Sequence, residues 1–158
     1  MIAAANLLLA AWLGASVLFT AVVAPAAFRV LPARMLAGAV VGQVLPVIFL
    51  SGIVVALMAL GLTARRPMRL RRWWQLGLAC CLLGCGVAQF GIAPRIRALR
   101  EQLPANLESV PPEDPRRATF GRLHGVSVAV LGAAMLGAAL APVVGLRSAP
   151  TGGKEIPT

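Results

Sequence analysis

The residues best suited to chemistry lie at the entrance to the last apolar stretch of the chain. His124, the only histidine, comes two positions after Arg122 and three before Ser127, so His124 and Ser127 share a helix face. Residues 125–146 carry no charge and are long enough to cross a bilayer. Ionisable groups at such an entrance are costly in lipid and usually face protein or water. The pattern predicts either a hydrogen-bonded helix contact or a site for a ligand, an ion or a proton.

Other polar side chains fall in the same half of the membrane if the helices thread up and down. They are Thr20, Gln43 and Gln89, from three further apolar runs. Two interpretations remain open: an interhelical hydrogen-bond cluster, or a polar vestibule with a cationic rim for an anion or acidic head group. The candidate ligand-binding residues are His124, Arg122, Ser127, Gln43, Gln89, Arg95 and Arg34.

Cysteine offers a weaker possibility. Cys81 and Cys85 are four residues apart, share a helix face and can present two thiolates to a soft metal such as Cu(I). Cysteine also buries readily as a small apolar side chain, which is the simpler interpretation. The single histidine argues against bis-histidine haem within a monomer. A haem or copper site would use His124, alone or across a dimer, and Cys81 and Cys85 are further metal candidates. No cofactor is predicted; haem or copper is the alternative.

The elements that must position these residues are four apolar runs, at residues 3–28, 35–62, 73–92 and 125–146. Each reaches the roughly 20 residues needed to span a bilayer. We therefore expect an all-α polytopic membrane protein, an antiparallel bundle of four transmembrane helices. Residues 1–147 form this domain, and residues 148–158, with several glycines and prolines, are expected to be a disordered tail. The connection at 29–34 is short, so helices one and two should form the tightest hairpin.

The connections give further expectations. Proline disfavours helical geometry in the residue before it, so Leu31-Pro32 should break the chain between helices one and two. The third helix should continue beyond the membrane through Arg95, Arg97 and Arg100. Asp114 can cap the last helix, with Pro115 at its first position. Small-residue faces suited to close helix approach occur at Gly77, Gly84 and Gly91, at Gly38-xxx-Gly42 and at Gly121-xxx-Gly125; they fit either one bundle or a homo-oligomer.

Composition sets the class of protein. The chain is 59% hydrophobic and 13% charged, with a net charge of +10, whereas soluble domains average about 25% charged residues. The basic residues lie between apolar runs, which argues against nucleic-acid binding and for contact with anionic lipid head groups, above all at the Arg65–Arg72 loop. Positive charges are almost balanced across the membrane, seven against eight. The compact basic loop favours a cytoplasmic position for that loop and both termini.

Several sequence fragments resemble one family of small four-span proteins, transmembrane protein 205 and its bacterial relatives with a domain of unknown function. They cover most of the chain from Trp12 to about Leu140. The fragments are Trp12-Leu13-Gly14, Ala24-Pro25, Phe28, Leu31-Pro32, Gly38-Ala39-Val40, Leu45-Pro46, Ala93-Pro94-Arg95-Ile96, Leu99-Arg100, Phe120, Arg122, Leu123-His124-Gly125 and Ser127. The resemblance implies an integral membrane protein, here of the bacterial cytoplasmic (inner) membrane, without an established reaction. The tryptophan-glycine start is more distantly similar to copper-resistance membrane proteins.

No signature of a familiar soluble enzyme, such as a Walker loop, GxSxG or HExxH, occurs in the sequence. The leading hypothesis is a non-enzymatic membrane protein, a transport element or an accessory subunit that works through its polar end. The alternative is a metal- or haem-binding membrane redox protein that uses His124.

Overall fold

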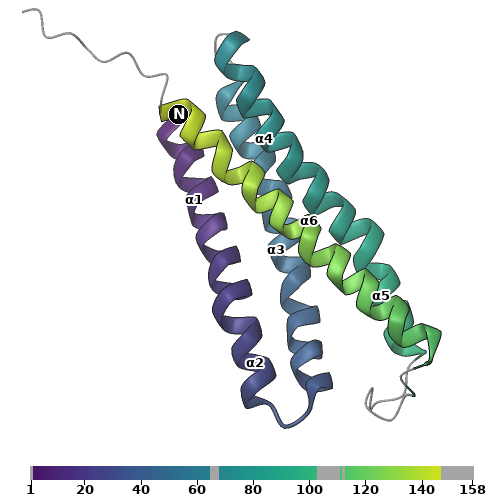
Figure 1. The fold of residues 1–158 in the computed structure, drawn as a ribbon. Helices are drawn as coiled ribbons and strands as arrows, with labels where there is room; N and C mark the ends of the chain where they lie inside the picture. The colour runs from purple at the N-terminus through teal and green to yellow at the C-terminus, as the bar shows by residue number, and fades with distance from the viewer. Residues whose placement is uncertain (1, 65–67, 103–110, 112, 147–158) are drawn as a thin grey trace, which may run out of the picture.

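The computed structural model describes residues 2–64, 68–102, 111 and 113–146, and all of their regular structure is helical. The chain forms two helical hairpins (Figure 1). The first consists of α1 (Ile2–Leu18), η1 (Phe19–Val23), α2 (Ala24–Val30) and the returning helix α3 (Arg34–Thr63). The second consists of α4 (Met68–Gly86), η2 (Val87–Ile92), α5 (Ala93–Glu101) and the returning helix α6 (Pro115–Leu146). The expected all-α bundle is confirmed.

Four helices in the described residues are long and apolar enough to cross a membrane: Ile2–Val30, Arg34–Thr63, Trp74–Glu101 and Pro115–Ala141. In the second hairpin the helices reach further than the apolar runs alone, because α5 continues through the arginines and α6 begins at Pro115. The start of α1 and the end of α6 lie at one end of the bundle, and the α2–α3 turn and α5 lie at the other (Figure 1). We call this second end, which carries residues 28–42, 95–102 and 113–124, the polar end. The predicted tail at 148–158 is outside the described residues.

Proline explains where the first hairpin turns. Leu31 is extended, with φ −78° and ψ 138°, directly before Pro32, and Ala33 is extended before α3 begins. The predicted break is confirmed. The other end of the molecule differs from expectation, because residues 68–72, expected as a loop, already belong to α4.

Both hairpins contain a π-helical turn followed by Ala-Pro. In η1 the Ala24 N–H donates to the Phe19 carbonyl, and in η2 the Ala93 N–H donates to the Ala88 carbonyl. A proline ring clashes with the carbonyl four residues before it in an α-helix. Widening the preceding turn relieves this clash, and it places one extra residue in the helix. The turn rotates every later side chain of that helix by about 100° relative to a continuous α-helix.

The core lies between the two hairpins. Trp12 of α1 packs against Gly52 of α3 and Cys85 of α4, and its indole N–H donates to the Ile48 carbonyl at 3.0 Å. The most extensive helix contact is between α4 and α6. Our expectation that helices one and two form the tightest pair is therefore wrong. Glycine decides this, because Gly77 and Gly137 let the two backbones touch, whereas a short loop only joins its helices.

Candidate functional site

The polar end is organised around Arg100, which α5 projects toward α3. One guanidinium nitrogen, Nη2, lies 2.7 Å from the position that a Cβ at Gly38 would occupy. The other, Nη1, lies 2.9 Å from the corresponding position at Gly42. The guanidinium therefore occupies the small-residue face that the sequence suggested for a neighbouring helix. Backbone contact between α3 and α5 is slight, so this side chain bridges the gap between them.

An aromatic pair on α6 closes the other side of the guanidinium. The Cζ atom of Arg100 lies 5.7 Å from the centroid of the Phe120 ring, within the range of a cation–π contact. Phe120 and His124 are stacked, with their ring centroids 6.5 Å apart and their planes at 2°. His124 belongs to the helix row that continues into buried Ser127 and Leu131, yet it is exposed. The bundle is therefore open at the level of His124 and closed one turn further on.

Arg100 has no counter-charge among the residues that the structure describes. Its side chain is half-buried, and the described residues supply neither a carboxylate nor a hydrogen-bond acceptor to it. The nearby acid Asp114 is held by Arg116 instead. A desolvated cation without an anionic partner is unfavourable, and a bound anion would remove that cost.

Of the residues that the sequence proposed for the site, the structure brings His124 and Ser127 to the inward row of α6. Gln89 is partly buried in η2, and its Oε1 atom has no hydrogen-bond partner in the described part of the chain. It lies eleven residues before Arg100, about 16 Å deeper at 1.5 Å per residue. Gln89 therefore lies along the same helix but beyond the reach of a group bound at Arg100.

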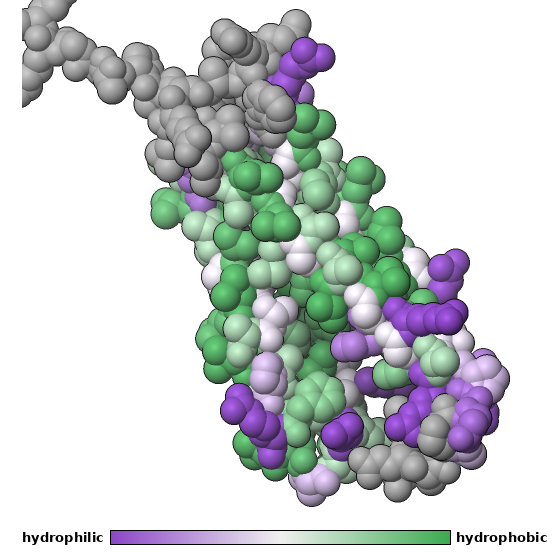
Figure 2. Space-filling view, viewed as in Figure 1, coloured by the Kyte–Doolittle hydropathy of each residue, from purple (hydrophilic) through white to green (hydrophobic). Residues whose placement is uncertain are grey.

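The other proposed site residues are not brought to the guanidinium. Gln43 is exposed in a row of α3 with Leu36, Val40 and Val47, which are exposed as well, so it faces away from the bundle. Arg34, Arg95 and Arg122 are also exposed. Figure 2 shows hydrophilic residues gathered at the polar end and hydrophobic ones along the middle of the same face. These three arginines add to the positive charge of the end, and the described contacts with Phe120, Gly38 and Gly42 belong to Arg100.

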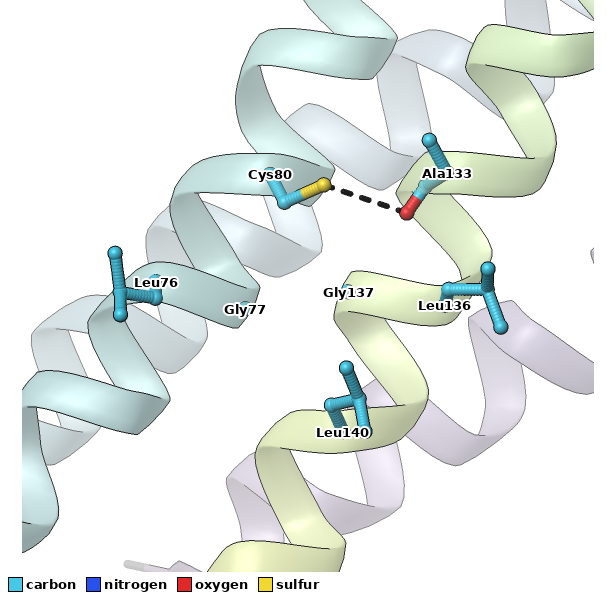
Figure 3. A pocket seen from close by; sticks show the side chains of 7 residues that line it. All are labelled: Leu76, Gly77, Cys80, Ala133, Leu136, Gly137 and Leu140. Carbon is cyan, nitrogen blue, oxygen red and sulfur yellow. Dashed lines mark hydrogen bonds between the residues drawn. The ribbon is translucent and has the colours of Figure 1, made fainter.

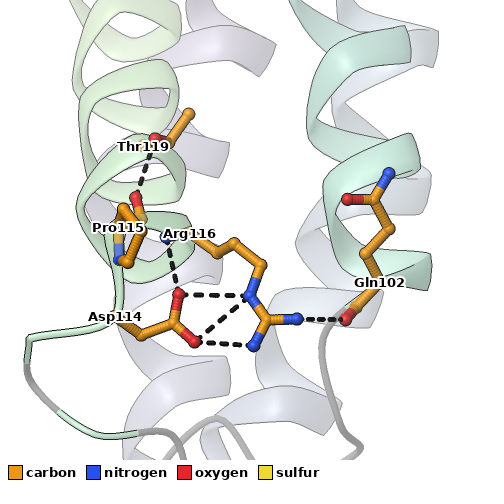
Figure 4. Close-up of polar contacts among 5 residues, drawn as sticks. All are labelled: Gln102, Asp114, Pro115, Arg116 and Thr119. Carbon is orange, nitrogen blue, oxygen red and sulfur yellow. Dashed lines mark hydrogen bonds and ion pairs between the residues drawn. The ribbon is translucent and has the colours of Figure 1, made fainter.

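The start of α6 is capped as the sequence predicted. The Asp114 carboxylate accepts the Arg116 backbone N–H at 2.8 Å, and Thr119 donates its hydroxyl to the Pro115 carbonyl at 2.8 Å (Figure 4). The Arg116 guanidinium donates to both Asp114 oxygens and, at 3.1 Å, to the Gln102 carbonyl after α5. Hydrogen bonds from Arg116 lower the pKa of the Asp114 carboxyl below its ordinary value. These contacts tie the end of α5 to the start of α6.

The cysteines lie away from this end, in the packed middle of the bundle. Cys81 and Cys85 are both fully buried. The described residues contain no group of three or more His, Cys, Asp or Glu side chains that could hold a metal ion. The two thiols therefore gain no third described ligand, and the contact of Cys85 with the Gly52–Trp12 junction is a packing contact.

An apolar groove of about 640 Å³ runs between α4 and α6 (Figure 3). Leu76, Gly77, Cys80, Ala133, Leu136, Gly137 and Leu140 line it. Cys80 lies on its wall, and the thiol donates to the Ala133 carbonyl at 3.4 Å. Its leucines are exposed and suit contact with lipid chains.

The sequence predicts Arg100 on the extension of the third helix and the Gly38–Gly42 pair in a packing face, but it does not predict that the two are in contact. Two features of the sequence indicate this contact. Arg100 lies in register with Ile92 and Ile96, which are buried and half-buried along the inward row of the helix. A pair of glycines four residues apart leaves space that a long side chain can fill as well as a helix can.

Length, apolar surface and topology together define a four-span helical membrane protein with a basic, partly open end. Residues 7–105 match the family model described as Domain of unknown function (DUF4149). The match covers more than half of the chain, so the protein belongs to this family. It begins within α1 and runs through α5, and α6 lies beyond it. No curated protein and no solved structure was found to match the chain.

Proposed function

We propose that the protein is a non-enzymatic membrane component, a transport element or an accessory subunit, that binds an anion at its polar end. The observation that carries this proposal is the Arg100 guanidinium, half-buried between α3, α5 and α6 without a described anionic partner. His124 and Ser127 form the inner wall on α6, and Arg34, Arg95 and Arg122 form a basic rim that attracts anions. Gln43 faces outward and Gln89 lies deeper, so neither contacts the anion.

The setting of this function is part of the same proposal. The resemblance to transmembrane protein 205 and its bacterial relatives supports a place in a bacterial cytoplasmic membrane. The basic segment Arg65–Arg72, of which residues 68–72 belong to α4 and residues 65–67 lie outside the described part of the chain, is proposed to contact anionic head groups from the cytoplasm, on the side that carries both termini. Labelling of an introduced Ala64→Cys by an impermeant reagent tests this orientation, because Ala64 is exposed directly after α3; the unsubstituted protein gives the background from Cys80. Labelling above that background in intact cells would show the opposite orientation.

Anion binding can be measured with purified protein in a non-ionic detergent. A ligand that binds the folded state stabilises it, by about 1.4 kcal/mol at ten times its Kd. Titration with inorganic phosphate should raise the melting temperature with saturation, and the Arg100→Gln variant should lose most of the shift. Arg97→Gln is the matched control, because Arg97 lies on the same helix but is exposed. An equal shift in wild type and Arg100→Gln would contradict the proposal.

The same preparation separates this function from the redox alternative that uses His124. Visible absorption and metal analysis should show no haem and no stoichiometric metal. A haem spectrum or one bound metal ion per chain, lost in His124→Ala, would replace anion binding with the redox function.

A further inference from the structure

We infer that the anion bound by Arg100 is the phosphate of an anionic phospholipid, which enters sideways from the bilayer between α3 and α5. This inference rests on the proposed function, since it names the ligand of the same site. Under this inference the polar end is a lipid-binding site that is reached from the bilayer, rather than a site that is reached only from water.

Depth is the first reason for a lipid. The 30 residues of α3 measure about 45 Å, close to the roughly 40–45 Å of a whole bilayer with its head groups, of which about 30 Å is hydrocarbon. Gly38 and Gly42 come four and eight residues after Arg34, so they lie about 6 and 12 Å from the end of the helix. Each head-group layer is roughly 5–8 Å thick by the same dimensions. The guanidinium therefore lies where head groups meet hydrocarbon, at the depth of lipid phosphate.

Access is the second reason. α3 and α5 diverge toward the polar end (Figure 1), and Arg100 reaches across where their backbones do not pack. On the side of α3 that borders this opening, the exposed apolar side chain of Met35 lies one turn before Gly38. A molecule with its phosphate at Arg100 can lay its acyl chains along this surface, whereas a free anion would gain nothing from it.

Charge and geometry are the third reason. A guanidinium binds phosphate oxygens through two parallel N–H donors. Eight described arginines surround the polar end, against three described acids, one of which is already paired with Arg116. The arginines are Arg29, Arg34, Arg95, Arg97, Arg100, Arg116, Arg117 and Arg122, and the acids are Glu101, Glu113 and Asp114. This excess of positive charge favours a lipid with a net negative charge over a zwitterionic one.

The experiment compares one head group with and without acyl chains. Delipidated protein in a non-ionic detergent is titrated with short-chain phosphatidylglycerol, with short-chain phosphatidylcholine and with glycerophosphoglycerol, the same head group without its chains. Bound lipid is counted by native mass spectrometry. We expect phosphatidylglycerol to bind at least about tenfold more tightly than either other molecule, a difference of about 1.4 kcal/mol. Arg100→Gln should weaken its binding by about tenfold or more, and Arg97→Gln should leave it unchanged.

A second, milder variant tests the same site in case Arg100→Gln does not fold. A Cβ at Gly38 would overlap the far end of the Arg100 side chain, which can move away without disturbing a backbone. Gly38→Ala should therefore keep the fold and still weaken phosphatidylglycerol binding. Gly125→Ala is its control, because a Cβ there meets nothing within 4 Å.

The outcomes distinguish this inference from the function on which it rests. Equal binding of glycerophosphoglycerol and phosphatidylglycerol would overturn the lipid and leave an anion site. Equal binding of phosphatidylcholine would overturn the choice of an anionic lipid. Wild-type lipid affinity in both Arg100→Gln and Gly38→Ala would make the guanidinium an interhelical contact only. If no phosphate compound binds, the proposed function falls as well.

Discussion

The crossing of α4 and α6 gives the sharpest test of the fold, because two glycine backbones touch there. A Cβ added to Gly137 would lie 2.6 Å from the Gly77 carbonyl oxygen and 3.0 Å from the Cys80 Cβ. A Cβ added to Gly77 would lie 2.6 Å from the Gly137 carbonyl oxygen. Neither carbonyl can rotate away as a flexible side chain can. Gly137→Ala must therefore push the two helices apart.

The magnitude follows from the distance. Ordinary van der Waals contact begins near 3.4 Å, so the helices must separate by about 0.8 Å locally. A gap of that size forfeits a quarter to a half of each atom pair's attraction of about 0.1–0.2 kcal/mol. Over a few tens of pairs the loss reaches roughly 1–2 kcal/mol, within the range of about 1–3 kcal/mol for overpacked cores.

A matched glycine on the same helix removes the effect of helix propensity. Gly132→Ala also replaces a glycine in α6, where a Cβ would meet nothing within 4 Å. Both variants gain the same preference of alanine for a helix, up to about 1 kcal/mol. The difference between their free energies of unfolding therefore isolates the clash. We expect Gly137→Ala to be less stable than Gly132→Ala by about 1–3 kcal/mol.

Reversible unfolding in mixed micelles, driven by SDS and followed by circular dichroism, measures this difference. Gly77→Ala against Gly86→Ala is a second pair on α4, since Gly86 is also open. Because both clashes lie at one crossing, the double variant Gly77→Ala/Gly137→Ala should cost less than the sum of the two. A difference below about 0.5 kcal/mol between Gly137→Ala and Gly132→Ala, the usual effect of a neutral surface change, would refute the backbone contact.

Three further variants test other parts of the structure. Trp12→Phe should lower the free energy of unfolding by on the order of 2 kcal/mol in the same assay, because it removes the hydrogen bond to Ile48 and packing against Gly52 and Cys85; unchanged stability would contradict that junction. Asp114 has a folded pKa below its ordinary 3.8, so its contribution to stability is present above 3.8 and is lost as the pH falls through the folded pKa. Asp114→Asn should accordingly lower the melting temperature at neutral pH, by an amount that shrinks as the pH falls below 3.8. A loss that does not depend on pH would show that the carboxylate charge is irrelevant. Pro94→Ala permits an ordinary α-helix through η2, which turns Arg100 about 100° away from Gly38, so anion binding should fall as in Arg100→Gln; Pro46→Ala in α3, where no π-helical turn occurs, should retain it.

Run length and local chemistry were sufficient to predict the architecture. The four helices are set by uncharged stretches, and hydrocarbon leaves a spanning chain few alternatives to a helix. The break at Leu31-Pro32 and the cap at Asp114 also followed from the sequence, since each depends on neighbours along the chain. The expected helix beyond Arg95 is confirmed by α5 for the same reason.

The sequence did not predict which side chains of one helix face another helix, because this depends on the rotation of each helix about its own axis. Gly77, Gly84 and Gly91 form one seam by spacing, yet only Gly77 and Gly84 contact α6, because η2 inserts an extra residue per turn and moves Gly91 away. The seat of Arg100 has the same origin. Arg100 comes after the π-helical turn η2, which changes the direction of every later side chain. A regular α-helix of 3.6 residues per turn, extended from the middle of α4, therefore predicts that Arg100 points away from Gly38.

The two hairpins use the same local plan, and Arg100 is where they differ. Each has a π-helical turn, Ala-Pro, a short helix and then a glycine pair four residues apart on the returning helix. Seven residues after the alanine that donates across the π-helical turn stands Leu31 in the first half and Arg100 in the second. The glycine pair of the first half receives the guanidinium, whereas a Cβ at Gly121 or Gly125 in the second half would meet nothing. Packing alone would use both glycine pairs alike. Because one pair holds a charge and the other remains open next to His124, the asymmetry favours a binding role for this end of the bundle.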